Sequence, residues 1–270
     1  MDPWLVAGVL GLLQGLLEWL PVSSEGAITI ARSALGAAPD VATRYALFLH
    51  AGTAVAAAAY YRTELVHLAA AIPTWRPRSA FGPGTADLSF FGLATLCSGV
   101  VGVTGYAVLA DLAQATAGGV FVAGIGALLL ATGVFMRVAE HRATGRRDRP
   151  ELLDAVLIGV LQGFAVLPGI SRSGTTVSAL LLRGHDGPDA LRLSFLLSIP
   201  AAAGAGLLVV VDHGLPTGGL GPAVLALGIS AVVGYLAVDA LVRLVSRVAF
   251  WRVCVGFGAL AVIGGLLVLL

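Results

Sequence analysis

The sequence predicts an all-α polytopic membrane protein made of two inverted repeats, with six transmembrane helices and two re-entrant helical hairpins that meet near the bilayer midplane. Three observations predict this fold class. Hydrophobic residues make up 58% of the 270 residues and charged residues 11%, and the mean hydropathy is +0.94, whereas a soluble domain has about 25% charged residues. A proline-broken pattern occurs twice, with Gln14 and Gln162 lying 148 residues apart in the two copies. The arginines gather in a few loops.

Six stretches are long enough to cross the hydrocarbon core, which takes about 20 apolar residues. Three lie in each half of the chain, at 41–61, 89–110, 117–137, 190–211, 221–243 and 250–269. Because three is an odd number of crossings, the second half must insert upside down relative to the first. We therefore expect one membrane domain, 1–270, in which repeat one is 1–150 and repeat two is 151–270.

Four shorter apolar pieces flank the two proline breaks. They cover 4–20 and 24–34 around the first break, and 152–166 and 173–183 around the second. Such short pieces do not cross the bilayer comfortably, and broken backbone at membrane depth is tolerated only where it is buried in protein or faces water. Each pair is therefore predicted to form a re-entrant hairpin. The inverted repeats make the two hairpins enter from opposite faces and meet.

The distribution of the arginines supports this topology. With re-entrant hairpins, thirteen of the sixteen arginines fall in loops on one side, and the opposite side holds only Arg32 and Arg44. Cytoplasmic loops carry the excess of basic residues, so these loops are predicted to be cytoplasmic and both termini external. Treating either hairpin as a crossing would scatter the arginines over both sides. The thirteen are Arg62, Arg76, Arg78, Arg137, Arg142, Arg146, Arg147, Arg149, Arg183, Arg192, Arg243, Arg247 and Arg252.

Two further classes of feature are not expected. Met1-Asp2-Pro3 lacks the basic region of a cleavable targeting signal. The two cysteines, Cys97 and Cys254, lie in apolar runs, which argues against a disulfide framework or a thiolate metal site.

Polar residues gather at both breaks. Gln14 and Glu18 share one helical face before the first break, and a charge inside a membrane segment costs about 2.5–3.5 kcal/mol and is by default functional. The alternative for Glu18 is an interfacial carboxylate near a helix end. Two serines open the helix after each break, and each of them by itself is also explained as an N-cap. They are Ser23 and Ser24, and Ser171 and Ser173.

The two breaks together predict an anion site. Helix N-termini that meet from opposite faces direct free N–H groups and positive dipole ends at one spot. Arg172, between the two serines of the second break, adds a planar guanidinium suited to phosphate. The expected ligand is a phosphate carried by a lipid.

These residues resemble a known family, the undecaprenyl-pyrophosphate phosphatases of the bacitracin-resistance type. The resemblance covers essentially the whole chain. Its two main motifs are Gln14 to Glu18 with Pro21-Val22-Ser23-Ser24 and Gly26, and Pro168-Gly169-Ile170-Ser171-Arg172-Ser173-Gly174 with Thr176. It extends to Leu193-Ser194-Phe195-Leu196-Leu197 with Pro200, and to the last span after Ser246-Arg247.

The resemblance implies hydrolysis of a polyprenyl (undecaprenyl-type) diphosphate to the monophosphate lipid carrier and inorganic phosphate, at the outer side of the membrane and with a divalent cation, Mg or Ca. By position, Ser24 corresponds to the nucleophile, Arg172 to the phosphate-binding arginine, and Glu18 to the essential acidic residue, which is also the expected metal ligand. The residues that correspond to the substrate-binding positions are Gln14, Ser23, Gly169, Ser171, Ser173 and Thr176.

The sequence departs from the family pattern at one position, which concerns the proton acceptor. Ala27 stands where the family typically has histidine, and Glu25 directly follows the second serine. A serine is a weak nucleophile without a base. Three replacements are conceivable: Glu18 as base, Glu25 as base, or a metal held by both that activates water. His50 is a further candidate for the compensating residue, and its alternative is a structural helix-to-helix hydrogen bond.

The sequence thus predicts a phosphatase of the plasma membrane that recycles a lipid carrier for cell-envelope glycan synthesis. Its expected partners are polyprenyl diphosphate and membrane lipids, and no nucleic acid. The alternative is a transporter or flippase of polyprenyl phosphate or another anionic lipid, because inverted repeats with broken helices are also typical of carriers. A serine and an acidic residue beside one arginine favour the enzyme. The polyprenol, the metal, a homodimer and a bacitracin phenotype stay open.

Overall fold

The computed structural model describes residues 2–115, 118–143, 145, 147–216, 219–245 and 249–268. Arg146, Ser246 and Arg247 lie outside this part of the chain. All regular secondary structure within it is helical. The α-helices are α1 (Pro3–Leu17), α2 (Ser24–Ala34), α3 (Pro39–Tyr60), α4 (Arg62–Ala71), α5 (Ala86–Ala115), α6 (Gly118–Arg142), α7 (Leu152–Gly163), α8 (Arg172–Leu182), α9 (Gly187–His213), α10 (Leu220–Val245) and α11 (Phe250–Leu267), and the 3₁₀ turns are η1 (Ile72–Thr74), η2 (Pro77–Ser79) and η3 (Phe164–Val166).

Five helical segments in the described residues are long and apolar enough to cross a membrane. They are Ala86–Leu109, Gly118–Arg142, Gly187–His213, Leu220–Ala240 and Phe250–Leu267, which match five of the six predicted spans. The sixth, 41–61, forms the 22-residue helix α3, about 33 Å long at 1.5 Å per residue. Its length suffices, but Arg44, His50 and a high share of alanine make α3 less apolar than the other five.

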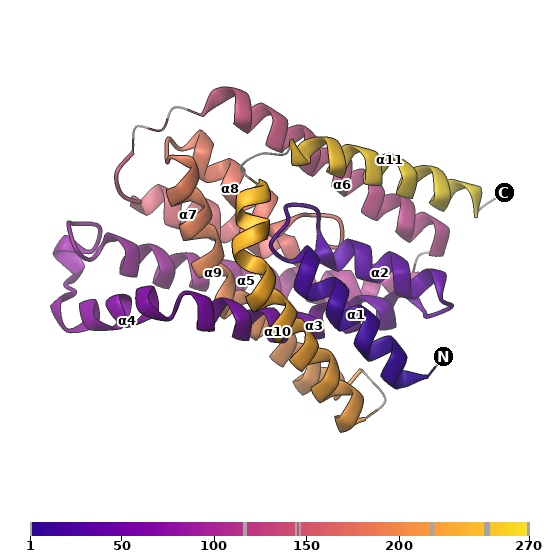
Figure 1. Cartoon of the computed structure of the whole chain (residues 1–270). Helices are drawn as coiled ribbons and strands as arrows, with labels where there is room; N and C mark the ends of the chain where they lie inside the picture. Colours follow the sequence, from indigo (N-terminus) through magenta and orange to yellow (C-terminus); the bar gives the residue numbers. More distant parts are fainter. Residues whose placement is uncertain are drawn as a thin grey trace.

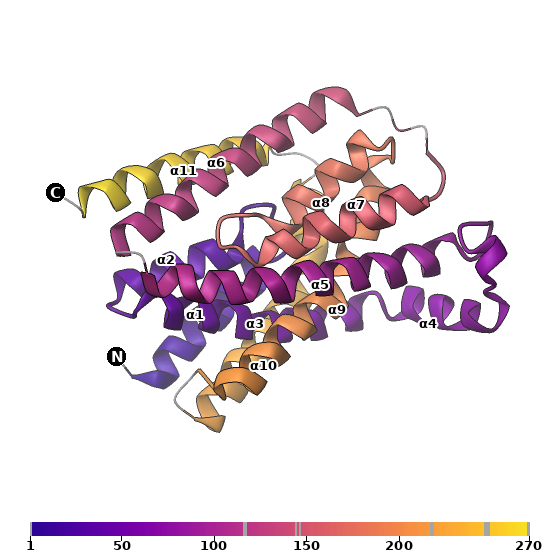
Figure 2. The ribbon, with the colours of Figure 1, turned by 180° about the vertical axis from the view of Figure 1, so that it is seen from behind.

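The segment 62–88, expected to be a loop, is partly helical. Helix α4 follows α3 after a single residue, and both views show the two running on in nearly the same direction (Figure 1, Figure 2). The physical reason is composition, because Arg62–Ala71 consists mainly of good helix formers such as Leu, Ala and Glu.

The helices pack in pairs that join the two halves of the chain. Helix α1 lies along α10, α7 along α5, α3 along α9, and α6 along α11 (Figure 1). Glycines permit the first two contacts: a Cβ on Gly11 would lie 2.6 Å from the carbonyl oxygen of Ala226, and one on Gly159 would lie 2.5 Å from that of Ala94. Such close backbone approach is how helices associate in membranes, where no hydrophobic force drives them together.

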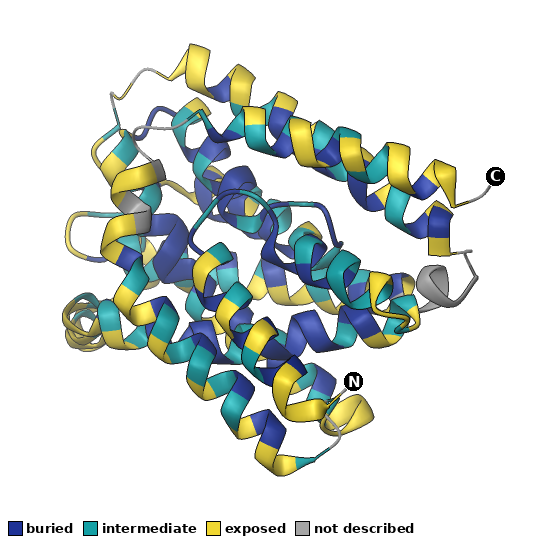
Figure 3. Ribbon diagram, turned by 45° about the vertical axis from the view of Figure 1, so that its right-hand side comes forward, coloured by how far each residue is buried: buried dark blue, intermediate teal, exposed yellow. Residues whose placement is uncertain are grey.

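The burial pattern is typical of a protein that is surrounded by lipid. Buried residues gather where the helices meet, and exposed positions follow the outer sides of the helices (Figure 3). Large apolar side chains are among the exposed ones, including Leu236, which is 73% exposed, and Leu260, which is 67% exposed. Large apolar side chains on the outer sides of long apolar helices fit contact with lipid.

Each proline break lies between two short helices, as predicted. The first separates α1 from α2, and the second, with η3, separates α7 from α8. Ser23 and Ser171 are the N-caps: their Oγ atoms accept hydrogen bonds from the N–H groups of Gly26 (3.2 Å) and Gly174 (3.1 Å). The N-cap interpretation therefore holds for these two serines, while Ser24 and Ser173 lie inside the first helical turn.

An ion-pair cluster closes the base of the second hairpin, where α7 begins and α8 ends. The fully buried carboxylate of Asp154 accepts a hydrogen bond from Arg183 Nε (2.5 Å) and one from the N–H of Glu151 (2.8 Å). His185, also fully buried, lies between Asp154 (3.5 Å from Nε2) and Asp189 (2.8 Å from Nδ1). The cluster joins both ends of this hairpin to the start of α9.

We expect the stability of the protein to fall as the pH rises towards 9. Burial alone lowers the pKa of His185, but its two carboxylate neighbours outweigh burial and raise the pKa to about 9. A histidine whose pKa is higher in the folded than in the unfolded chain stabilises fully below about pH 6.5, and this contribution is lost as the pH passes the folded value. Thermal unfolding in detergent between pH 6 and 10 measures the effect. His185→Gln should flatten the profile, and an unchanged profile would contradict the assignment.

Candidate active site

The two proline breaks are in direct contact, as the sequence predicts. The N–H of Gly169, in the second break, donates to Ser23 Oγ in the first at 3.1 Å. Ser173 Oγ donates to the carbonyl oxygen of Leu20 at 3.3 Å. The two helix N-termini of α2 and α8 are thereby held at one place inside the protein.

Glycine is required at this contact. Gly169 has φ = +102°, and a Cβ there would overlap the carbonyl oxygen of Ile125. A Cβ on Gly26 would lie 3.0 Å from the backbone nitrogen of Gly169. The two loops approach each other this closely only because neither residue carries a side chain.

Glu18 is the centre of the polar contacts. Its Oε2 accepts hydrogen bonds from Ser24 Oγ at 2.7 Å and from Gln14 Nε2 at 2.9 Å, and its Oε1 accepts one from Arg172 at 2.5 Å. The residue is only 6% exposed and faces the interior of the protein. Such a buried charge is costly unless it is paired and fully hydrogen-bonded, and here Arg172 meets that need.

His50 reaches the same carboxylate from α3. Its Nε2 lies 3.3 Å from Glu18 Oε2, and its Nδ1 lies 2.9 Å from the carbonyl oxygen of Ala46 in the same helix. Because a carbonyl oxygen only accepts hydrogen bonds, Nδ1 carries a proton in this contact. His50 thus has a polar contact with Glu18. Ala27 lies in α2, one residue past Gly26.

Glu25 differs from Glu18 in having a free carboxylate oxygen. The residue is 4% exposed, and its Oε1 has no hydrogen-bond partner among the described residues. Of the acceptors considered for the proton of Ser24, Glu18 is the one that Ser24 contacts. Glu25 is left available for another ligand.

Most of the predicted site residues line one small polar pocket between the breaks. Its lining comprises Glu18, Leu20, Ser23, Ser24, Glu25, His50, Ala165, Ile170, Ser171, Arg172 and Ser173. Three predicted substrate-binding residues, Gln14, Gly169 and Thr176, are not among them. They contact residues that do line it: Gln14 contacts Glu18, Gly169 contacts Ser23, and Thr176 Oγ1 donates to the carbonyl oxygen of Arg172 at 2.9 Å.

Two further residues, Ser194 and Thr53, contact the site although the sequence motifs do not single them out as site residues. Ser194 Oγ pairs with Thr176 Oγ1 at 2.6 Å, and its carbonyl oxygen accepts from Arg172 at 3.4 Å. Thr53 Oγ1 accepts from Gln14 at 3.4 Å. Both residues are hydroxyls within predicted spans, which is the available signal for them in the sequence.

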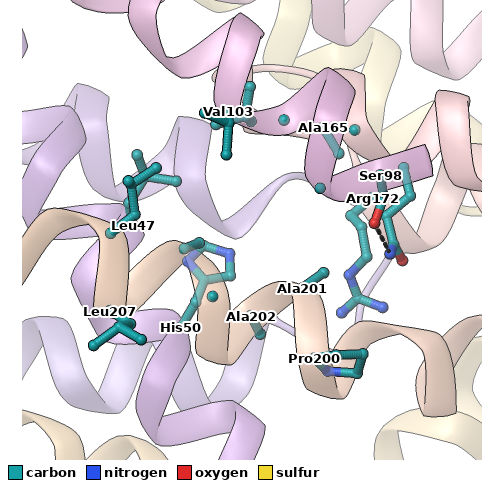
Figure 4. Close-up of a pocket in the computed structure, with 18 of the residues that line it drawn as sticks. Leu47, His50, Ser98, Val103, Ala165, Arg172, Pro200, Ala201, Ala202 and Leu207 are labelled. Carbon is teal, nitrogen blue, oxygen red and sulfur yellow. Dashed lines mark hydrogen bonds between the residues drawn. The ribbon is translucent and has the colours of Figure 1, made fainter. Parts of the chain in front are cut away.

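An apolar cavity of about 400 Å³ adjoins the polar pocket and shares Glu25, His50, Ala165 and Arg172 with it. Figure 4 shows the side chains of His50 and Arg172 beside this space, with Pro200 and Ala201 of α9 along its wall. The remaining walls come from α3, α5, α7 and η3. A small polar pocket thus lies directly beside a larger apolar one.

A metal ion held by the protein alone would need several ligating side chains close together. Across the described part of the chain, no three His, Cys, Asp or Glu side chains are grouped to hold a metal ion. The expected metal at Glu18 therefore stays a prediction, and any ion here would take further ligands from elsewhere.

Comparison with known proteins gives one consistent result. The family model of the bacitracin resistance protein BacA matches residues 7–263. A protein of Haloarcula marismortui named undecaprenyl-diphosphatase is 58% identical over 271 residues and covers 100% of both chains. Proteins of the same name from Methanopyrus kandleri (39% identical; 94% of this chain, 93% of the other) and Geobacter sulfurreducens (38%; 91% of each) also match. The resemblance seen in the sequence is confirmed, and this chain, a multi-pass membrane protein, belongs to the BacA bacitracin resistance family.

Proposed function

We propose that this protein hydrolyses a polyprenyl diphosphate of the undecaprenyl type to the monophosphate lipid carrier and inorganic phosphate. The observation that carries the proposal is the contact of Ser24 with Glu18, which is itself paired with Arg172. A carrier of anionic lipids needs the arginine but no hydroxyl held against a carboxylate. The name shared by the relatives supports the same activity.

The diphosphate would lie in the polar pocket at the N-termini of α2 and α8. There the helix dipoles and the guanidinium of Arg172 favour the negative charge of the terminal phosphate. The first part of the isoprenoid tail would enter the adjoining apolar cavity, whose volume of about 400 Å³ lies in the range of ligand pockets.

Ser24 Oγ would attack the terminal phosphorus, or hold a water molecule that does so. In the first case a bond from Oγ to phosphorus forms, the bond to the bridging oxygen breaks, and the polyprenyl monophosphate leaves. Water then cleaves the phosphoserine. In both cases Glu18 Oε2, at 2.7 Å from Ser24 Oγ, is the nearest acceptor for the proton. His50, against the same oxygen, is proposed to compensate for the histidine missing at Ala27 by supporting Glu18.

A divalent cation, Mg²⁺ or Ca²⁺, is proposed as cofactor. The residues fit such an ion because Glu25 carries a buried carboxylate oxygen without a partner among the described residues, in the pocket that Glu18 also lines. Mg²⁺ is typically held by one or two carboxylates together with substrate phosphates. When bound by Glu18 and Glu25, the cation would neutralise charge on the phosphates.

Glu25→Gln should weaken the binding of the cation. We expect the Mg²⁺ concentration that gives half-maximal activity to rise at least tenfold, because one of two protein carboxylates is lost. Binding of Mn²⁺ to the protein without substrate, followed by electron paramagnetic resonance, should weaken in parallel. Glu151→Gln, at a half-exposed carboxylate, is the control. Equal Mn²⁺ affinity in wild type and Glu25→Gln would reject Glu25 as a ligand.

We also propose the finer topology: six spans including α3, two re-entrant hairpins from opposite faces, and two inverted repeats. The helix pairs support it. In the two repeats, α1, α2, α3, α5 and α6 correspond in order to α7, α8, α9, α10 and α11. Replacing each helix by its counterpart then converts the α1–α10 pair into the α7–α5 pair. The same replacement converts the α3–α9 pair and the α6–α11 pair into themselves, as expected for two related halves. The arginine-rich loops would be cytoplasmic and the active site would open to the outer side of the plasma membrane.

Phosphate release from a polyprenyl diphosphate by the purified protein tests the proposed activity. The wild type should release phosphate with Mg²⁺ or Ca²⁺ and lose activity with chelator, and Ser24→Ala should release at least 10²-fold less. Ser33→Ala, on the same helix and away from the pocket, is the matched control. The phosphatase function would be rejected if the wild type released no phosphate with any metal. If the protein also moved the lipid between the leaflets of a vesicle, the transporter function would take its place.

A further inference from the structure

The apolar cavity beside the active site is open to the side, between α5 and α9. Three of the residues that line it are large apolar side chains with most of their surface exposed: Val103 is 56% exposed, Leu207 63% and Val211 76%. In a membrane such side chains face lipid. The cavity therefore adjoins the polar pocket at one end and opens at its side to the hydrocarbon of the bilayer.

The volume of the cavity sets how much of a tail it holds. An engineered apolar cavity of about 150 Å³ holds one benzene molecule, which has six carbons. On that scale, a cavity of about 400 Å³ accommodates about 16 carbons, which is close to three five-carbon isoprene units. Units beyond the third would lie in the bilayer, where lipid chains are as apolar as the protein.

Two exposed glycines stand on the helices that flank this opening. Gly99 on α5 and Gly204 on α9 both line the cavity, and a Cβ on either would meet no other atom of the described residues within 4 Å. The glycines at the helix crossings, such as Gly11 and Gly159, are different because a Cβ there would collide with backbone. Helix packing therefore does not explain Gly99 and Gly204, whereas an unobstructed space for a ligand does.

We infer that the protein selects its lipid by the first three isoprene units, and that Gly99 and Gly204 determine this selectivity by leaving room for the tail between α5 and α9. The inference rests on the proposed phosphatase function. A leucine at either position would add four carbons, close to one isoprene unit, into this space. It should reduce the tail that the cavity holds from about three units to about two, so that a one-unit tail still fits.

Hydrolysis of diphosphates with one, two, three and eleven isoprene units tests this inference. For the wild type, kcat/KM should rise up to three units and change little beyond. The selectivity ratio is kcat/KM for three units divided by kcat/KM for one unit. Gly99→Leu and Gly204→Leu should lower this ratio by about tenfold or more, because one methylene too many in a pocket lowers kcat/KM by at least about tenfold. The rate with one unit reports that the variants are folded and active.

Gly92→Leu is the matched control. Gly92 lies on α5 and is exposed, and it does not line the cavity. A Cβ added to it would meet no other atom in the described part of the chain within 4 Å, so its variant should behave as the wild type. If the wild type hydrolyses these diphosphates but both cavity variants keep its ratio, the selectivity role is wrong and the phosphatase stands. If the wild type hydrolyses none of them, the proposed function fails and the inference with it.

Discussion

Glu18→Gln should abolish phosphate release, with kcat lowered by about 10²–10⁴-fold, the usual contribution of a positioned general base. The amide keeps the size of the side chain but cannot take the proton of Ser24, whose Oγ lies 2.7 Å from Glu18 Oε2 in the wild type. At Mg²⁺ concentrations that saturate the variant, KM should not rise, because Arg172 loses its carboxylate partner and becomes more available to the phosphate. Steady-state kinetics in detergent separates the two parameters.

Loss of the fold is the competing explanation for an inactive Glu18→Gln protein. Its thermal unfolding should therefore be measured beside that of the wild type, and Ser33→Ala again serves as a variant of the same region without a role in the pocket. A folded Glu18→Gln protein with more than one-tenth of the wild-type kcat would show that Glu18 is not the base. Glu25 would then be the next candidate, as the other buried carboxylate of the pocket.

Asp154→Asn should destabilise the protein by about 3–5 kcal/mol, the cost of removing one partner from a buried ion pair. Arg183 and His185 would then lose the buried carboxylate that they share, and the base of the second hairpin would lose its link to α9. The single amide oxygen of asparagine can accept from Arg183 or from the Glu151 N–H, but not from both as the two oxygens of Asp154 do. A lowered midpoint in thermal or denaturant unfolding in detergent measures the effect.

Glu151→Gln is the control for Asp154→Asn. Glu151 belongs to the same cluster, but its side chain is 58% exposed, and exposed ion pairs contribute at most about 1 kcal/mol. Equal stability losses in the two variants would show that burial of Asp154 does not set the strength of the cluster. Phosphate release at low temperature, where both variants are folded, should stay near the wild-type rate because neither residue lines the polar pocket.

The helices are predictable from the sequence where a local pattern decides them. Five spans follow from the length of apolar runs, and the ends of α1 and α7 follow from the prolines at 21 and 168 together with the serines that cap the next helix. Helix α3 shows the limit of this reasoning. Its length predicts a span like the others, yet its polar residues include His50 and Thr53, which contact Glu18 and Gln14 outside α3.

The identity of the site residues is also predictable from the sequence, but which of them line the pocket and which contact each other is not. Gln14, Gly169 and Thr176 carry the same polar or conformational signals as the residues of the pocket, and the structure places them behind it. Likewise, nothing in the local sequence distinguishes the engaged carboxylate of Glu18 from that of Glu25, whose Oε1 has no partner among the described residues. These distinctions depend on which side chain a neighbouring helix presents.

The sequence by itself determined that this is a helical membrane protein with two broken helices carrying serines, a buried glutamate and an arginine, because apolar length, proline and helix capping act within a few residues. Only the tertiary structure decided that Arg172 meets Glu18 across 154 residues of chain, that Ser24 donates to that same carboxylate, and that α5 and α9 leave an apolar cavity beside them. Such contacts depend on how small residues on distant helices let backbones approach, and this close packing is a property of the whole assembly of helices.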